Sequence, residues 1–272
     1  MSDRLTHLSL FTGIGGLDLA AEWAGFTTVG QCEWADYQTK VLEKHWPDVP
    51  RWRDIRTLTK ESFYERTGLR TVDVISGGFP CQPFSVAGKQ KGKGDDRYLW
   101  PEMLRVIREL RPHCVVGENV PGIIKIAAGQ VVKDLEHAGY NVVVFNYEAA
   151  AVGAWHRRSR VFFVGYAKHD GQHGTSDAAK DTGEHPPRGS AGECCEAIHY
   201  TMRGGQPGQH GRCESQELAD GRCWATEPDV GRVVNGLPNR VDRLKCLGNA
   251  VVPQQAYPIF KALKEELDRD QH

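Results

Sequence analysis

The chain has 272 residues, eight cysteines and a formal net charge of −1. This length can bury a core without disulfide staples, and it suits one large α/β domain, with or without a small appendage. The near-neutral charge argues against indiscriminate coating of a polyanion, although a locally basic cleft remains compatible with it. Because we find no long apolar run and no leader-like start, we expect a soluble cytoplasmic protein with reduced cysteines and no membrane contact.

The first elements predict a nucleotide-binding unit. A strand at Leu8–Phe11 leads into the glycine turn TGIGG and then into a helix at Leu17–Trp23. A second strand, Thr28–Cys32, ends at Glu33, where a carboxylate can accept hydrogen bonds from ribose hydroxyls. The glycines, at 13, 15 and 16, lack the full G-x-G-x-x-G spacing. The glycine turn together with Glu33 nevertheless predicts an adenosine ligand. An NAD-dependent oxidoreductase remains an alternative explanation for these two features.

Two further strand ends carry reactive side chains. The strand Val72–Ser76 is followed by GGFPCQPFS, in which Cys81 lies between two prolines that restrict the backbone. This pattern predicts a nucleophile on a rigid loop, with a buried structural cysteine as the alternative. The strand Cys114–Gly117 leads to Glu118, which can act as a general acid or serve as a capping or ion-paired residue. In a parallel sheet, Cys81 and Glu118 would face one pocket.

Downstream elements continue the alternation of helix and strand. Asp54, at the end of a tryptophan-rich stretch, is a candidate for an adenine contact, a helix N-cap or a surface acid. The remaining expected elements are a helix at Asp36–His45, helices near Pro101–Leu110, Gln130–Ala138 and Gln254–Asp268, and strands at Asn141–Phe145 and Val161–Val164. Residues 166–234 are polar, rich in glycine and weakly periodic. Their cysteines and histidines fit ordinary loop residues better than a zinc site, because no C-x-x-C pair occurs.

Five motifs together resemble, in order and spacing, those of DNA cytosine-5 methyltransferases. They are FTGIGGLDLA at 11–20, GGFPCQPFS at 77–85, ENVPG at 118–122, RRSRVFFVG at 157–165 and GNAVVP at 248–253. The resemblance implies an α/β fold: a Rossmann-like, mostly parallel sheet with helices on both faces, plus a small loop-rich target-recognition region. It divides the chain into a catalytic and cofactor-binding domain (1–166), a short target-recognition region (167–246) and a C-terminal segment that completes the catalytic domain (247–272).

The resemblance also implies roles for individual residues. Cys81 is similar to the nucleophile that attacks carbon 6 of a flipped cytosine, and Glu118 to the acid that interacts with ring nitrogen 3. Asn119 matches the residue that orients this loop, and Arg158 and Arg160 match basic residues of the pocket. The implied contacts to S-adenosylmethionine come from Phe11, Gly13, Gly15, Leu17, Glu33, Trp34, Asp54, Ile55, Pro80, Leu99, Asn249 and Val251. The resemblance implies no metal.

These implications predict a methyltransferase that acts on carbon 5 of a cytosine flipped out of double-stranded DNA. We expect a monomer, and a restriction endonuclease that acts on the same site is a candidate partner. The alternatives are a tRNA cytosine-5 methyltransferase and a catalytically silent nucleic-acid-binding homologue. One departure affects the arginine motif, where Trp155-His156 replaces the usual Pro-Gln. The target sequence is not encoded in any motif that we can identify, since it depends on which side chains reach major-groove edges.

Overall fold

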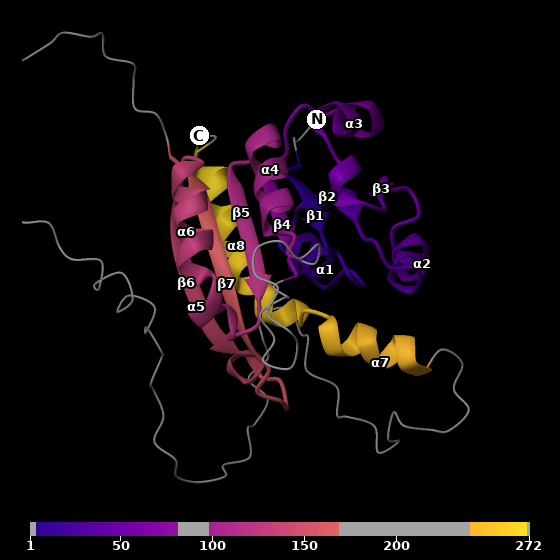
Figure 1. Cartoon of the computed structure of the whole chain (residues 1–272), viewed down its shortest axis with the longest axis vertical. Coiled ribbons are helices and arrows are strands. Elements are labelled where there is room, and N and C mark those ends of the chain that lie inside the picture. Colours follow the sequence, from indigo (N-terminus) through magenta and orange to yellow (C-terminus); the bar gives the residue numbers. More distant parts are fainter. Residues whose placement is uncertain (1–3, 81–97, 169–239, 271–272) are drawn as a thin grey trace, which may run out of the picture.

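Seven strands form one sheet in the computed structural model, which describes residues 4–80, 98–168 and 240–270. The strand order is β3-β2-β1-β4-β5-β7-β6, and Figure 1 shows the sheet with helices on both sides. The strands are β1 (Thr6–Leu10), β2 (Thr27–Cys32), β3 (Arg51–Trp52), β4 (Val74–Gly77), β5 (Cys114–Asn119), β6 (Tyr140–Glu148) and β7 (Ser159–Ala167). The fold confirms the predicted α/β class with a mostly parallel sheet.

The sheet is parallel from β3 to β5, whereas β7 runs antiparallel to both of its neighbours. Only residues 149–158 connect β6 to β7. A parallel connection needs a crossover of a dozen or more residues, usually a helix, so this short turn can only return the chain antiparallel. Both strands are also longer than the apolar runs predicted, because their ends carry polar residues that still pair across the hairpin.

Eight α-helices and two short 3-10 turns accompany the strands in the described ranges. They are α1 (Gly16–Trp23), α2 (Asp36–His45), η1 (Ile55–Thr57), α3 (Lys60–Thr67), α4 (Trp100–Leu110), α5 (Ile123–Ile126), α6 (Ala128–His137), η3 (Ala149–Val152), α7 (Arg240–Asn249) and α8 (Pro253–Asp270). The expected helices agree with the observed ones to within about two residues, whereas α3, α5 and α7 were not predicted. None of the helices described is long and apolar enough to cross a bilayer.

Alternating side chains divide the core into two layers, one on each face of the sheet. Ile75 and Val115 pack with residues of α4 and α6 on one face. Val74 and Val116 pack with α1 and α8 on the other. Successive side chains of a strand point to opposite faces, so a strand covered on both sides is largely apolar, as β4 and β5 are before the polar residues at their carboxyl ends. Both helical layers thereby hold the central strands in place.

The topology reverses between β1 and β4, which are neighbours at the centre of the parallel part. From β1 the chain proceeds outward through β2 to β3, and from β4 it proceeds outward on the other side to β5. In open α/β sheets of this kind, ligands bind outside the carboxyl ends of the strands at such a switch point. The loops that follow β1, β2, β3 and β4 therefore define the place to look for a site.

Candidate active site

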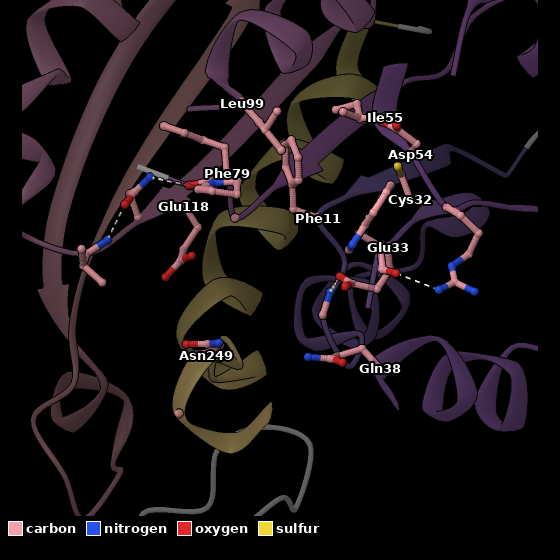
Figure 2. Close-up of a pocket in the computed structure, with 18 of the residues that line it drawn as sticks. Phe11, Cys32, Glu33, Gln38, Asp54, Ile55, Phe79, Leu99, Glu118 and Asn249 are labelled. Atoms are coloured by element: carbon pink, nitrogen blue, oxygen red, sulfur yellow. Dashed lines mark hydrogen bonds between the residues drawn. The ribbon is translucent and has the colours of Figure 1, made fainter. Parts of the chain in front are cut away.

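A pocket of about 750 Å³ lies at the carboxyl ends of the parallel strands. Its volume lies within the range of small-molecule and cofactor sites. Figure 2 shows Glu118 and Phe79 on one side, Glu33 and Gln38 on the other, and Phe11 and Leu99 between them. Twelve of the predicted site residues line the pocket: Phe11, Gly13, Glu33, Trp34, Asp54, Ile55, Pro80, Leu99, Glu118, Asn119, Arg160 and Asn249.

Glu33 is held by backbone amides at one end of the pocket. The N–H of Gly13 donates to Oε2 at 2.7 Å, and the N–H of Ala35 donates to Oε1 at 2.9 Å. Burial raises the pKa of the Glu33 carboxyl, and these two donors oppose the rise. Each carboxylate oxygen has a second lone pair, so the group can still accept hydrogen bonds from a ligand diol.

Three predicted cofactor residues lie behind the pocket rather than in its wall. Gly15 has a φ of +88°, and a Cβ there would lie 2.4 Å from the ring of Trp46, so only glycine fits. A Cβ on Gly16 would lie 2.5 Å from the carbonyl oxygen of Val251. Leu17 is buried in the layer that includes α8. Gly15, Leu17 and Val251 therefore pack behind the glycine turn that follows β1 and do not line the pocket.

Asp54 caps the 3-10 turn η1 and also lines the pocket. Its Oδ1 accepts a hydrogen bond from the N–H of Arg56 at 3.0 Å. The N-cap role and the ligand-facing position, which the sequence leaves as alternatives, thus coexist. The apolar wall beside it includes Ile55 and Cys32, and Figure 2 shows Asp54, Ile55 and Cys32 on the same side. An apolar wall with one adjacent acid suits a flat heterocycle that carries an exocyclic amine.

Arg105 of α4 fastens η1 to the rest of the domain. Its guanidinium donates to the carbonyl oxygens of Ile55 at 2.8 Å and Leu58 at 3.1 Å. It also pairs with Glu102 at 2.9 Å and with Glu109 at 2.8 Å. The fixed fork of the guanidinium matches several acceptors at once. Arg105 therefore positions the segment that presents Asp54 and Ile55.

Glu118 and Arg160 form a buried ion pair at the other end of the pocket. Arg160 Nε lies 2.7 Å from Glu118 Oε1, and the side chains are 12% and 10% exposed. Burial raises the pKa of the Glu118 carboxyl to about 7, against the opposing charges of Arg160 and Arg158. A carboxyl with this pKa can hold or release a proton near neutral pH, as a general acid requires.

Asn119 holds the segment after β4 against the end of β5. Its Nδ2 donates to the carbonyl oxygen of Phe79 at 2.9 Å, and its Oδ1 accepts from the N–H of Val120 at 3.0 Å. A Cβ on Gly78 would lie 3.0 Å from Glu118 Oε2, which shows how closely the two segments approach. Pro80 is the last residue described here, and Cys81 lies outside the described residues. So does most of the predicted target-recognition region, residues 169–239.

Arg158 does not line the pocket, although it was predicted among its basic residues. Its Nη2 donates to the carbonyl oxygens of Gly248, at 2.9 Å, and Ala250. Its φ of +36° is unusual for a residue with a side chain. Asn249, between these two carbonyls, does line the pocket. Arg158 therefore joins β7 to the junction of α7 and α8 and supports Asn249 from behind.

Eight residues that line the pocket were not predicted: Cys32, Gln38, Arg53, Arg56, Gly78, Phe79, Val120 and Gly248. Most of them are neighbours of predicted residues, so the rule that ligands gather at strand ends could have found Cys32 and Gly78. Gln38 lies on α2, and its polar character on a surface helix gives no signal. Only the folded arrangement brings it to the pocket.

Residues 5–195 match the model of the family described as C-5 cytosine-specific DNA methylase. The Type II methyltransferase M.FnuDI of Fusobacterium nucleatum is 36% identical over 166 residues, which are 59% of this chain and 46% of that protein. M.AquIA of a Picosynechococcus strain is 36% identical over 174 residues, 58% of this chain and 70% of that protein.

A solved structure from E. coli, described as a prophage-encoded DNA modification methyltransferase, has a TM-score of 0.53 and 28% identity. The match covers 60% of this chain and 47% of that chain. The chain therefore spans about half the length of M.FnuDI and of the E. coli protein, and somewhat more than two thirds of M.AquIA.

Proposed function

Because the chain belongs to the C-5 cytosine-specific DNA methylase family, we propose that it transfers a methyl group from S-adenosylmethionine to carbon 5 of cytosine in double-stranded DNA. The observation that carries this proposal is the arrangement of Glu118, Arg160 and Asn119. The ion pair and the anchored start of the cysteine loop lie at one end of a single pocket, opposite Glu33. The groups that we propose for the reaction and for the cofactor thus line the same cavity.

The residues of the pocket fit S-adenosylmethionine. Glu33 offers carboxylate acceptors for the ribose hydroxyls, and Asp54 with the apolar side chain of Ile55 suits the adenine. Asn249 also lines the pocket, on the side of Glu118 in Figure 2, and would contact the methionine end. The bound cofactor would supply the methyl group. Gly15, Leu17 and Val251 would contribute by fixing the turn and the helix on which these contacts depend.

We propose that Cys81 attacks carbon 6 of the cytosine ring and thereby makes carbon 5 nucleophilic. Glu118 would donate a hydrogen bond or proton to ring nitrogen 3, which offsets the negative charge that develops on the ring. Arg160 would hold the Glu118 carboxyl in place, and Asn119 would fix the segment that leads to Cys81 through its bond to Phe79. The cytosine must leave the base stack, since carbons 5 and 6 are otherwise inaccessible to this attack.

Covalent trapping tests the proposal without knowledge of the target sequence. Duplex DNA in which 5-fluorocytosine replaces every cytosine should form a denaturation-resistant adduct with the wild-type protein in the presence of S-adenosylmethionine. Cys81→Ala should form no adduct and transfer no labelled methyl group. The matched control is Cys114→Ala, because Cys114 begins β5 at the edge of the sheet opposite the pocket. Adduct formation by Cys81→Ala, or none by the wild type, would refute the mechanism.

A parallel assay with tRNA would separate the DNA substrate from the RNA alternative. Bisulfite sequencing of DNA from a host that expresses the protein would then identify the modified cytosines. The division at residues 166 and 246, the cytoplasmic location, the monomeric state and the restriction endonuclease partner stay predictions.

A further inference from the structure

Trp155 is the most exposed large apolar side chain in the described part of the chain, at 75%. It lies on the turn that joins β6 to β7, and it does not line the pocket. Trp34, at 71%, is the other highly exposed indole in these ranges, and the pocket explains its position. Exposing the apolar surface of an indole to water is unfavourable in free energy, and tryptophan is enriched at binding interfaces. We therefore infer that the Trp155 side chain contacts a binding partner.

The turn presents Trp155 on a fixed support. Ala149 donates its N–H to the carbonyl oxygen of Arg157 at 2.6 Å, and Ala154 donates to the carbonyl oxygen of Ala149 at 3.2 Å. The side chains of Ala149 and Ala154 are buried beneath the turn. Gln255 of α8 donates to the carbonyl oxygens of Tyr147, at 2.8 Å, and Arg158, at 3.2 Å, so both strands of the hairpin are clamped at their base. Hydrogen bonds within the turn and from Gln255 therefore hold the backbone on both sides of Trp155 in place.

The turn lies beside the reaction end of the pocket. Arg157 is exposed, and Arg160, three positions later, lines the pocket and pairs with Glu118. Three residues of extended chain span at most about 10 Å, so Arg157 is close to the ion pair. Figure 1 shows the β6–β7 turn at the lower edge of the sheet, at the same end as α7, whose last residues line the pocket.

The charge of this turn is uniform in sign. Residues 149–158 contain two arginines and a histidine and no acidic residue. An exposed indole two positions from the exposed guanidinium of Arg157 suits nucleic acid, because a cation pairs with phosphate and an aromatic face stacks on a base or packs on a sugar. The positive charge disfavours a basic partner. A strand of DNA is thus the occupant that matches both the charge and the aromatic surface.

We propose that Trp155 and Arg157 form a DNA contact that grips the strand next to the extruded cytosine. Arg157 would pair with a phosphate, and Trp155 would stack on a base or pack on a sugar that the extrusion exposes. This inference rests on the proposed function, because it assumes that DNA approaches the pocket at this edge.

The test compares Trp155→Ala, Trp155→Phe and Arg157→Gln with Tyr64→Ala, a control for another exposed aromatic side chain, on α3. The probe is sheared genomic DNA from a host without cytosine methylation, which contains all short target sequences. Fluorescence anisotropy would measure DNA affinity, calorimetry the affinity for S-adenosylmethionine, and thermal denaturation the Tm.

Trp155→Ala should weaken DNA binding by about tenfold or more, whereas Trp155→Phe should retain most of the affinity. In methyl-transfer assays the change should appear as a raised KM for DNA with kcat largely kept. Arg157→Gln should weaken binding and reduce the dependence of log affinity on log salt by about one ion. Tyr64→Ala should match the wild type, and cofactor affinity and Tm should stay unchanged in all variants.

Wild-type DNA affinity in Trp155→Ala would overturn this inference while leaving the proposed function intact. A lowered Tm in Trp155→Ala would also overturn it, since it would mean that the indole packs against the chain itself. If the wild-type protein neither binds DNA nor transfers methyl groups to it, the proposed function fails, and this inference fails with it.

Discussion

Arg160 Nε lies 2.7 Å from Glu118 Oε1 because β7 runs antiparallel to β5. Glu118 is paired in register with Phe162, so Arg160 is its diagonal neighbour on the same face of the sheet. A parallel β7 would carry Arg160 to the opposite edge, away from the pocket. The ion pair at the reaction end thus depends on the short turn that reverses the chain between β6 and β7.

Replacing Glu118 tests its role as an acid. Glu118→Gln should lower kcat by about a hundredfold or more, since an amide cannot transfer a proton to ring nitrogen 3. Burial raises the pKa of this carboxyl to about 7, so wild-type turnover should fall as the pH rises above about 7 and the acid loses its proton. The residual turnover of Glu118→Gln should lack this decline.

Steady-state methyl transfer measured between about pH 6 and pH 9 would check both expectations. Glu136→Gln, an exposed change on α6, serves as the control and should behave as the wild type. Full activity in Glu118→Gln would rule out proton donation by this residue.

Arg105 should control cofactor affinity without touching the cofactor. Arg105→Ala removes the hydrogen bonds to the carbonyl oxygens of Ile55 and Leu58 and releases the segment that carries Asp54. Hydrogen bonds to charged groups contribute about 1.5–3 kcal/mol, so the Kd for S-adenosylmethionine should rise about tenfold. Arg105→Lys should recover little, because an ammonium group cannot reproduce the fork.

Isothermal titration of the cofactor would measure this effect. Arg108→Ala, a change at an exposed position of the same helix, is the matched control. Equal Kd values for the Arg105 and Arg108 variants would contradict a positioning role for Arg105.

Gly16 should be intolerant of even one methyl group. The added Cβ of Gly16→Ala would lie 2.5 Å from the backbone oxygen of Val251, which cannot move without shifting the start of α8. Overpacking of this kind costs about 1–3 kcal/mol, so the free energy of unfolding should fall by that amount. Urea denaturation would measure it.

Gly129→Ala provides the control, because nothing lies within 4 Å of a Cβ at that position on α6. It should leave stability unchanged or raise it by up to about 1 kcal/mol through helix propensity. If both glycine variants were equally stable, the close contact between Gly16 and Val251 would be absent in solution.

The Asp18 carboxyl should make the free energy of unfolding fall as the pH rises from about 4 to about 6. It is fully buried on α1, where it accepts hydrogen bonds from Ser9 Oγ at 2.9 Å and Gln31 Nε2 at 2.8 Å. Burial raises its pKa to about 6 from the ordinary 3.8. The native state therefore holds a proton between these values that the unfolded state has lost.

The stability that Asp18 contributes is thus present below about pH 4 and is lost as the pH rises through about 6. The free energy of unfolding of the wild type, relative to Asp18→Asn, should fall by about 3 kcal/mol across this window. Buried His7, whose pKa is lowered to about 3, acts in the opposite direction but is present in both proteins and cancels. Urea unfolding of both proteins at several pH values would check the difference, and parallel curves would contradict the prediction.

Local patterns were enough to predict most strands and helices and the residues that follow the strand ends. The runs at Val72–Ser76 and Cys114–Gly117 could be recognised because buried strands are apolar on both faces. The rule that ligands gather at carboxyl ends then brought Glu33 and Glu118 to one edge. Short elements such as β3 were not predicted, because a strand of two residues is too short to show a hydrophobic period.

The sequence by itself determined the family, the α/β class and the chemical types available at each strand end, because motifs and hydrophobic periods are local properties of the chain. Only the tertiary structure decided that Arg160 meets Glu118, that Asn119 anchors Phe79, and that Gly15, Leu17, Val251 and Arg158 lie behind the pocket. These facts depend on strand direction, register and close backbone approach between distant segments. Such relations are set by the packing of the whole core, which no single window of sequence contains.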